Sequence, residues 1–295
     1  MVQKFFEQLP IDEIYKDLFQ PGMKKAGEAL ATVVDGANLI LLPLKLLNEK
    51  SRIYFKKNIE LYSDKINKVE DLTLIQVPQY VGLPVIDKLT YLNQGDLANA
   101  FINLLSKASF EETLVFVHPA YIDILNRMSA DEAIILSQIK DEECIPYIDI
   151  NVRKNRKISD SETGINALRQ KTEALMDNNC GDFELIKYLT GMEKDLNLNY
   201  PNNINIYLEN LMLNGLLFYK KSYNRERVSV YQKLEEQYKE DIDNATLIIN
   251  ELYEKETKYK AEIIIQYGEL RFTELGKGFL KVCIQDISEN PIDQK

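Results

Sequence analysis

The feature that most constrains the fold of this chain is the apolar run ALATVVDGANLILLPLKLL, from Ala29 to Leu47. From Met23 onward, apolar residues recur at three- and four-residue steps, which predicts a helix. After Asn38 the apolar positions spread around the whole helix, and such a helix is normally buried. Pro43 predicts a kink or an end. The run therefore needs apolar neighbours in a protein core, a partner or a membrane.

The charges in and around this run favour burial over a membrane span. A spanning helix needs about 20 apolar residues with few charges. Asp35, Lys45 and Glu49 interrupt the pattern, and the stretch from Gly36 to Leu44 covers about half of that length. We expect burial in an N-terminal helical core. The alternative is a helix that leaves its bundle to enter a membrane or a partner's groove, through the candidate interaction residues Leu39, Leu41, Leu42 and Leu46.

Composition narrows the class of protein. The 295 residues carry a formal net charge of −10, so overall charge does not favour binding to nucleic acid or anionic lipid. The cysteines at 144, 180 and 283 are far apart and show no zinc or disulfide spacing, which favours a reducing compartment. The first residues carry charges throughout and lack the apolar core of a signal peptide. We therefore expect a cytoplasmic protein.

The pattern along the chain predicts a mainly helical protein. Five or six helices are expected before the alternating stretch Ile145–Val152, which predicts a strand. Ser129 and Glu132 have the spacing of a capping box, so a helix should begin there. A helical segment is expected from about residue 165 to 192, interrupted at Asn178–Gly181. A long charged helix should cover Tyr231–Lys260.

The order of elements in the second half suggests a winged helix. The segment LENLMLNGLLFYKK reads as a helix that ends at Gly215 and continues into a strand. AEIIIQYGELRFT reads as a hairpin with its turn near Tyr267–Gly268, and Thr273 should cap a closing helix. The expected fold class is mainly α (α+β). We expect two domains: a helical N-terminal domain, residues 1–127, and a winged-helix-like C-terminal domain with helical insertions, residues 128–295.

No motif in the sequence indicates catalysis. The GxSxG, HExxH, P-loop and GxGxxG patterns are absent. We expect the single histidine, His118, to bond nearby backbone at the start of a helix rather than to bind a metal or act as a base. We predict no catalytic residue, no metal ligand, no cofactor and no small-molecule ligand. A metal-dependent enzyme with carboxylates from distant parts of the chain stays an alternative, because pairs in space cannot be read from a sequence.

Two basic clusters leave nucleic-acid binding open as an alternative. Clustered cations are what binding to a phosphate backbone requires. One cluster follows the predicted strand, and the other follows the helix in the recognition position. The first consists of Arg153, Lys154, Arg156 and Lys157, and the second, our candidate contact, of Lys220, Lys221, Arg225 and Arg227. Self-association through the charged helix Tyr231–Lys260 is a further alternative.

Several segments of the sequence, taken together, resemble those of a known protein family. They are YKDLFQPGMKKAGEALATVVDGANLILLPLKLL, IQVPQYVGLPVIDKLTYL, LANAFINLLSKAS and VHPAYIDILNRMSADEAIILSQI, followed less distinctly by GLLFY and FTELGKGF. Together they resemble the abortive infection alpha (Abi-alpha) family, bacterial proteins linked to phage defence. The resemblance implies a helix-rich bacterial protein and brings no catalytic residues with it. Our leading hypothesis is a non-enzymatic defence protein that acts through a protein partner, self-association or a membrane.

Overall fold

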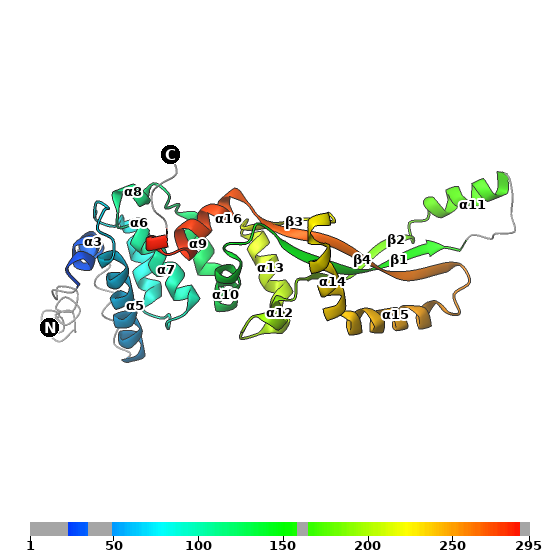
Figure 1. Ribbon diagram of the computed structural model, residues 1–295, viewed down its shortest axis with the longest axis horizontal. Coiled ribbons are helices and arrows are strands. Elements are labelled where there is room, and N and C mark those ends of the chain that lie inside the picture. Colours follow the sequence, from blue (N-terminus) through cyan, green and yellow to red (C-terminus); the bar gives the residue numbers. More distant parts are fainter. Residues whose placement is uncertain (1–22, 35–48, 158–164, 290–295) are drawn as a thin grey trace, which may run out of the picture. The chain divides into compact units, whose positions relative to one another are not determined.

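The computed structural model describes residues 23–34, 49–157 and 165–289. It is an α+β protein, mainly helical with a small antiparallel sheet (Figure 1). The described residues form two compact units. The first draws on Met1–Asp141, Leu213–Leu216 and Thr273–Lys295, and the second on Glu142–Met212 and Leu217–Phe272. The candidate residues Leu39, Leu41, Leu42 and Leu46 lie outside the described residues.

The first unit is a helical bundle built around α7 (Asp96–Lys107). Nine of the twelve residues of α7 are buried, because α5, α6, α9, α10 and the turn η5 all pack against it. The central place of α7 follows from its sequence, DLANAFINLLSK, which is apolar on most sides. The other elements are α3 (Lys24–Val34), α5 (Glu49–Asn67), α6 (Gln79–Leu89), α8 (Glu111–Leu114), α9 (Ala120–Arg127), α10 (Ala130–Ile139), α16 (Glu274–Phe279), the π-helical turn η5 (Leu280–Ile284) and the 3₁₀ turn η6 (Ile287–Glu289).

Local signals in this unit behave as expected. The predicted capping box opens α10: the Glu132 N–H donates to Ser129 Oγ at 3.3 Å, and the Ser129 N–H donates to the Glu132 carboxylate at 2.5 Å. His118 is exposed, and its Nδ1 accepts the N–H of Ala120 at 3.1 Å at the start of α9. The expected backbone bond of this histidine is therefore confirmed.

The closing helix α16 begins where Thr273 was expected to cap it. The Gly276 N–H donates to Thr273 Oγ1 at 2.9 Å. A Cβ atom at Gly276 would lie 2.1 Å from the carbonyl oxygen of Leu216, so only glycine lets the helix approach that backbone.

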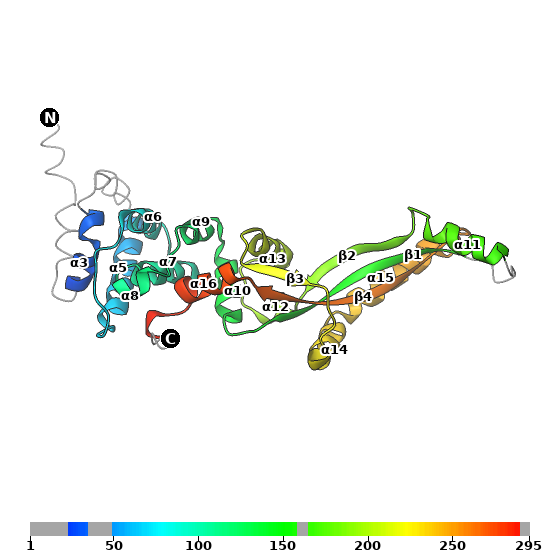
Figure 2. The same cartoon turned by 90° about the horizontal axis from the view of Figure 1, so that it is seen from above.

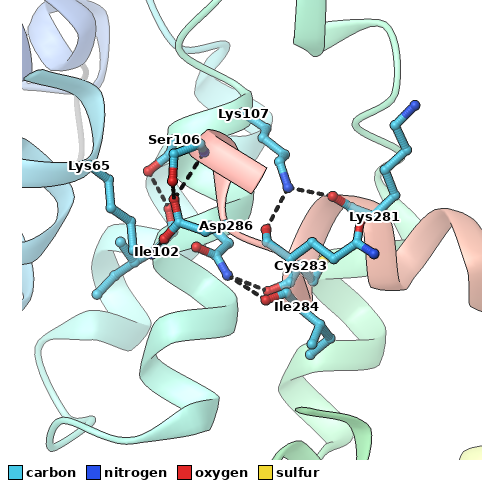
Figure 3. Close-up of polar contacts among 11 residues, drawn as sticks. Lys65, Ile102, Ser106, Lys107, Lys281, Cys283, Ile284 and Asp286 are labelled. Carbon is cyan, nitrogen blue, oxygen red and sulfur yellow. Dashed lines mark hydrogen bonds and ion pairs between the residues drawn. The ribbon is translucent and has the colours of Figure 1, made fainter. Parts of the chain in front are cut away.

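Polar side chains of α5 and α7 hold the turn that follows α16 (Figure 3). Asn103 Nδ2 donates to the carbonyls of Cys283 and Ile284 at 3.0 and 3.1 Å. The buried ammonium of Lys107 donates to the carbonyls of Lys281 and Gln285, the latter at 2.6 Å. These bonds satisfy carbonyls that a helix end leaves without intrahelical partners.

The second unit is organised by a four-stranded antiparallel sheet with the order β2-β1-β4-β3. Strands β1 (Ile145–Arg156) and β4 (Tyr259–Phe272) pair along the whole of β1. The remaining elements, in chain order, are α11 (Ile165–Leu175), β2 (Gly181–Leu189), α12 (Met192–Asp195), the 3₁₀ turn η3 (Pro201–Asn203), α13 (Ile204–Leu213), β3 (Leu217–Lys220), the 3₁₀ turn η4 (Arg225–Arg227), α14 (Val228–Gln237) and α15 (Lys239–Tyr253).

One face of this sheet carries the apolar core of the unit. Ile148 and Ile150 are fully buried there, together with Tyr231 and Leu234 of α14 and Tyr238. Ile242 and Ala245 of α15 pack on the same cluster. The sheet's apolar face is therefore covered by α14 and α15.

Two predictions about this unit were wrong. The segment predicted to be helical up to residue 192 contains a strand, β2, which pairs with β1. The hairpin predicted in 261–273 is absent because β4 runs through that segment without a turn, and Gly268 pairs with Tyr147. Its glycine makes room for an aromatic ring: a Cβ atom there would lie 2.2 Å from Tyr147 Cζ. Without that hairpin the winged-helix arrangement is not confirmed.

The predicted long helix is divided in two. Residue Tyr238, with φ −107° and ψ 18°, separates α14 from α15. The buried ring of Tyr238 and its N–H bond to Leu234 belong to the end of α14. The chain changes direction there (Figures 1 and 2), and α14 contacts β1 while α15 contacts β4.

Candidate functional site

The second face of the sheet carries a row of polar side chains. Residues opposite each other in an antiparallel pair lie on the same face, and neighbours alternate. Tyr147 pairs with Gly268 and Asp149 pairs with Gln266, so these residues share a face with Asn151. Tyr147, Asp149 and Asn151 are each at most 2% exposed. A buried polar row of this kind costs free energy unless its groups are satisfied.

Asp149 lies at the centre of the row, where the pairing of β1 with β2 is irregular. Its Oδ1 accepts the backbone N–H of Tyr188 at 2.8 Å, and Tyr188 has a left-handed φ of 53°. A left-handed tyrosine is strained backbone, which the surrounding structure must hold in place. Burial raises the pKa of Asp149, although the Tyr188 N–H and the nearby Lys221 favour its charged form. Asp149 therefore keeps a proton at a higher pH than an ordinary aspartate.

The neighbours of Asp149 are only partly satisfied. Asn151 Nδ2 donates to Gln266 Oε1 at 3.1 Å, while Asn151 Oδ1 has no hydrogen-bond partner in the described part of the chain. The hydroxyl of Tyr147 has none there either, and burial raises its pKa. The Tyr147 ring packs edge-on against Tyr188, with centroids 5.2 Å apart. The row is therefore a buried and incompletely hydrogen-bonded part of the sheet.

A hollow of about 520 Å³ borders this row. It brings together one residue from each predicted basic cluster, Arg153 and Lys221. Each has a carboxylate partner: Arg153 Nε lies 2.8 Å from Asp182, and Lys221 Nζ lies 3.2 Å from Glu184. Both acids come from β2. The positive charge that these cations offer to a phosphate is reduced accordingly.

The other cations of the two clusters are spread over the unit. Arg156 lies 3.7 Å from Glu173 of α11, and Lys154 lies over the ring of Tyr259. Lys220 is an exposed residue of β3. Arg225 and Arg227 belong to η4, where Arg225 is exposed and Arg227 is half-buried. Nucleic-acid contact by Lys220, Lys221, Arg225 and Arg227 stays a prediction.

Helix α11 exposes an apolar surface that no sequence motif indicates. Ile165, Leu168 and Met176 are 85, 69 and 77% exposed. Residues 165, 168 and 172 follow helical spacing and lie on one side of α11, and Met176 continues this spacing directly after the helix. With Arg156, Arg169, Glu173 and Asp177 they line an open groove of about 600 Å³. We call Ile165, Leu168, Thr172 and Met176 the α11 surface.

Helix α15 exposes a second apolar surface. Its inner residues Ile242, Ala245 and Ile249 pack toward the unit, with Ile249 buried. On the outer side Leu247, Ile248 and Leu252 are 58, 55 and 67% exposed. We call these three residues the α15 surface. Clustered exposed apolar side chains mark sites of interaction more often than singly scattered ones do.

Among residues 23–34, 49–157 and 165–289, no group of three or more His, Cys, Asp or Glu side chains is placed to hold a metal ion. Within these same ranges, no helix has the length and apolar content needed to cross a membrane.

Comparison with known proteins gives a family for the chain. The model of the family described as abortive infection alpha matches residues 53–283, which is most of the sequence. The chain belongs to the abortive infection alpha family. The match includes both candidate surfaces, on α11 and α15, and the polar row of β1. No curated protein and no solved structure matches the chain significantly. The family match confirms the resemblance that the sequence segments show.

Proposed function

We propose that this protein is a bacterial phage-defence protein that acts by binding protein, through the α11 surface and the α15 surface of its second unit. Membership of the abortive infection alpha family supports the role in defence. The observation that carries the mode of action is the exposure of six large apolar side chains, between 55 and 85%, on two helices of one unit.

The energetics favour an interaction at these surfaces. Burying a leucine, isoleucine or methionine against a partner contributes about 1.5–3 kcal/mol relative to leaving it in water. A few such side chains supply the greater part of the binding energy of many interfaces. Burial of the two surfaces would therefore contribute favourably to a reversible complex.

Phage plating on cells that express the protein tests the proposal. Leu168→Asp on α11 and Leu252→Asp on α15 should each remove protection, because a carboxylate would be desolvated in the interface. Both positions are exposed, so the fold should survive, and circular dichroism checks this. Val115→Asp is the matched control, since Val115 is 78% exposed but belongs to the first unit. Full protection by both folded surface variants would refute the proposal.

The apolar run Ala29–Leu47 is a separate candidate effector. It lies largely outside the described residues, so the proposed action on a membrane or partner rests on its sequence. Leu41→Asp and Leu42→Asp test it in the same plating assay. Loss of protection there, with the α11 and α15 variants fully active, would move the effector to this run.

Nucleic-acid binding is a second candidate function. The meeting of Arg153 and Lys221 at one hollow favours it, although both cations have carboxylate partners. Binding to a duplex should then weaken steeply with salt, and Lys220→Glu should weaken it further. A protein that binds neither duplex nor single strand at low salt would eliminate this candidate.

A further inference from the structure

We infer that the α11 surface of one copy binds the α15 surface of a second copy of this chain. The inference rests on the proposed function, because it names the partner that these surfaces bind. Two observations support it: the exposed apolar side chains of the α11 and α15 surfaces, and the opposite charges around these two surfaces.

The surroundings of the α11 surface are basic. Helix α11 carries Arg169 and Lys171 against one carboxylate, Glu173. That carboxylate is already occupied, since it lies 3.1 Å from Arg169 and 3.7 Å from Arg156. Lys258 adds positive charge near the end of the helix, over the ring of Tyr259, whose hydroxyl donates to the groove residue Asp177. Lys154 lies over the same ring and also over Tyr253 at the end of α15. A partner for this surface should therefore be acidic.

The surroundings of the α15 surface are acidic. Helix α15 carries four carboxylates, those of Glu240, Asp241, Asp243 and Glu251, against the single cation Lys239. Glu251 is exposed and lies one helical turn after Leu247 and beside Leu252. A partner for this surface should be basic and apolar, which describes the α11 surface.

Charge also decides between the possible pairings. Two α15 surfaces would repel each other, because like charges across an interface are unfavourable. Two α11 surfaces would bring their arginines and lysines together. The pairing of α11 with α15 is the one in which both the apolar residues and the charges match.

A second copy is needed to make this contact. Figure 1 shows α11 beyond the ends of β1 and β2, separate from α15, and Figure 2 shows α15 running alongside β4. Because each copy carries both surfaces, two copies related by a two-fold axis can form the contact twice. Two equivalent contacts bury both surfaces of both copies.

Sedimentation velocity of the purified full chain tests the first part of the inference. The wild-type protein should associate reversibly, and Leu168→Asp and Leu247→Asp should each shift it to monomer. Val115→Asp should associate like the wild type, because that exposed side chain lies in the first unit. A wild-type protein that stays monomeric at about 100 µM, or folded α11 and α15 variants that associate normally, would overturn the inference.

Charge reversal tests the pairing itself. Arg169→Glu, at the cation of α11 that lines the groove, and Glu251→Lys should each weaken association about tenfold, through repulsion at two contacts. An equimolar mixture of the two variants should associate with wild-type strength, because each contact between unlike copies again joins a cation and a carboxylate. A mixture no stronger than either variant alone would rule out α11–α15 pairing.

The two proposals fail in different ways. If the protein is monomeric but Leu168→Asp still loses phage protection, the second copy is not the partner and the proposed protein binding stands. If Leu168→Asp loses association but protects fully, the proposed function fails and the self-association stands.

Discussion

The ring of Tyr147 on β1 lies directly over Gly268 on β4, where a Cβ atom would come within 2.2 Å of Cζ and 2.3 Å of the hydroxyl oxygen. Tyr147 is fully buried and packs against Tyr188, so the ring has little room to move away. The relationship explains why a glycine stands inside a long continuous strand. It also ties the polar row of β1 to the backbone of β4.

Gly268→Ala should destabilise the second unit by about 1–3 kcal/mol, the usual cost of overpacking a buried site. Urea denaturation measures the change. In a Tyr147→Leu background the same alanine should cost less, because the ring atoms that it meets are gone. An equal cost in both backgrounds would mean that the Tyr147 ring is not the obstacle.

Asp149→Asn should keep or raise stability at neutral pH. The asparagine can still accept the Tyr188 N–H and carries no buried charge. Burial raises the pKa of Asp149, so the folded protein loses stability as pH rises from the unfolded pKa through the higher folded value. The advantage of asparagine should therefore be small in acid and grow toward neutral pH. Unfolding free energies measured across that range test this, and an asparagine variant less stable at neutral pH would contradict it.

Lys65 should stabilise the first unit in a pH-dependent way through its ion pair with Asp286. Burial alone would raise the Asp286 pKa, but Lys65 and Ser288 hold it at about 2, below its usual 3.8. A depressed carboxyl pKa gives stability that is present above pH 3.8 and lost as pH falls toward 2.

Lys65→Met should therefore lower the unfolding free energy by about 1–2 kcal/mol at neutral pH and flatten its acid dependence. Chemical denaturation at several pH values measures both effects. Lys56→Met, at an exposed position of the same helix, is the matched control. If the unfolding free energy of Lys65→Met falls in acid as much as that of the wild type, a carboxylate other than Asp286 causes the acid dependence.

The helices of the first unit could be predicted because their signals are local. The Ser129–Glu132 capping box and the Thr273 cap depend on residues three apart, and both are formed. Strand β1 could also be predicted, from the local alternation in Ile145–Val152, but β2 and the uninterrupted β4 depend on pairing with distant residues. The local sequence at Tyr267–Gly268 predicts a turn. Only the pairing of Gly268 with Tyr147, a residue far earlier in the chain, shows that this segment is a strand.

The candidate site was only partly visible in the sequence for the same reason. The basic cluster at Lys221 was found, but its partner Glu184 comes from β2, which was predicted to be helical. Helical spacing of Ile165 and Leu168 can be read from the sequence. Tertiary packing decides whether another element covers this face of α11, and in the structure Ile165 and Leu168 are exposed.

Co-expression of charge-reversed variants in phage-challenged cells tests most directly whether defence depends on contact between α11 and α15 of different copies, as we propose. Arg169→Glu and Glu251→Lys proteins, each made alone at limiting level, should protect poorly. Made together in the same cells, they should restore protection to the wild-type level, because only the mixed contact joins opposite charges throughout. Wild-type protection by each variant alone, or no gain on co-expression, would contradict the claim.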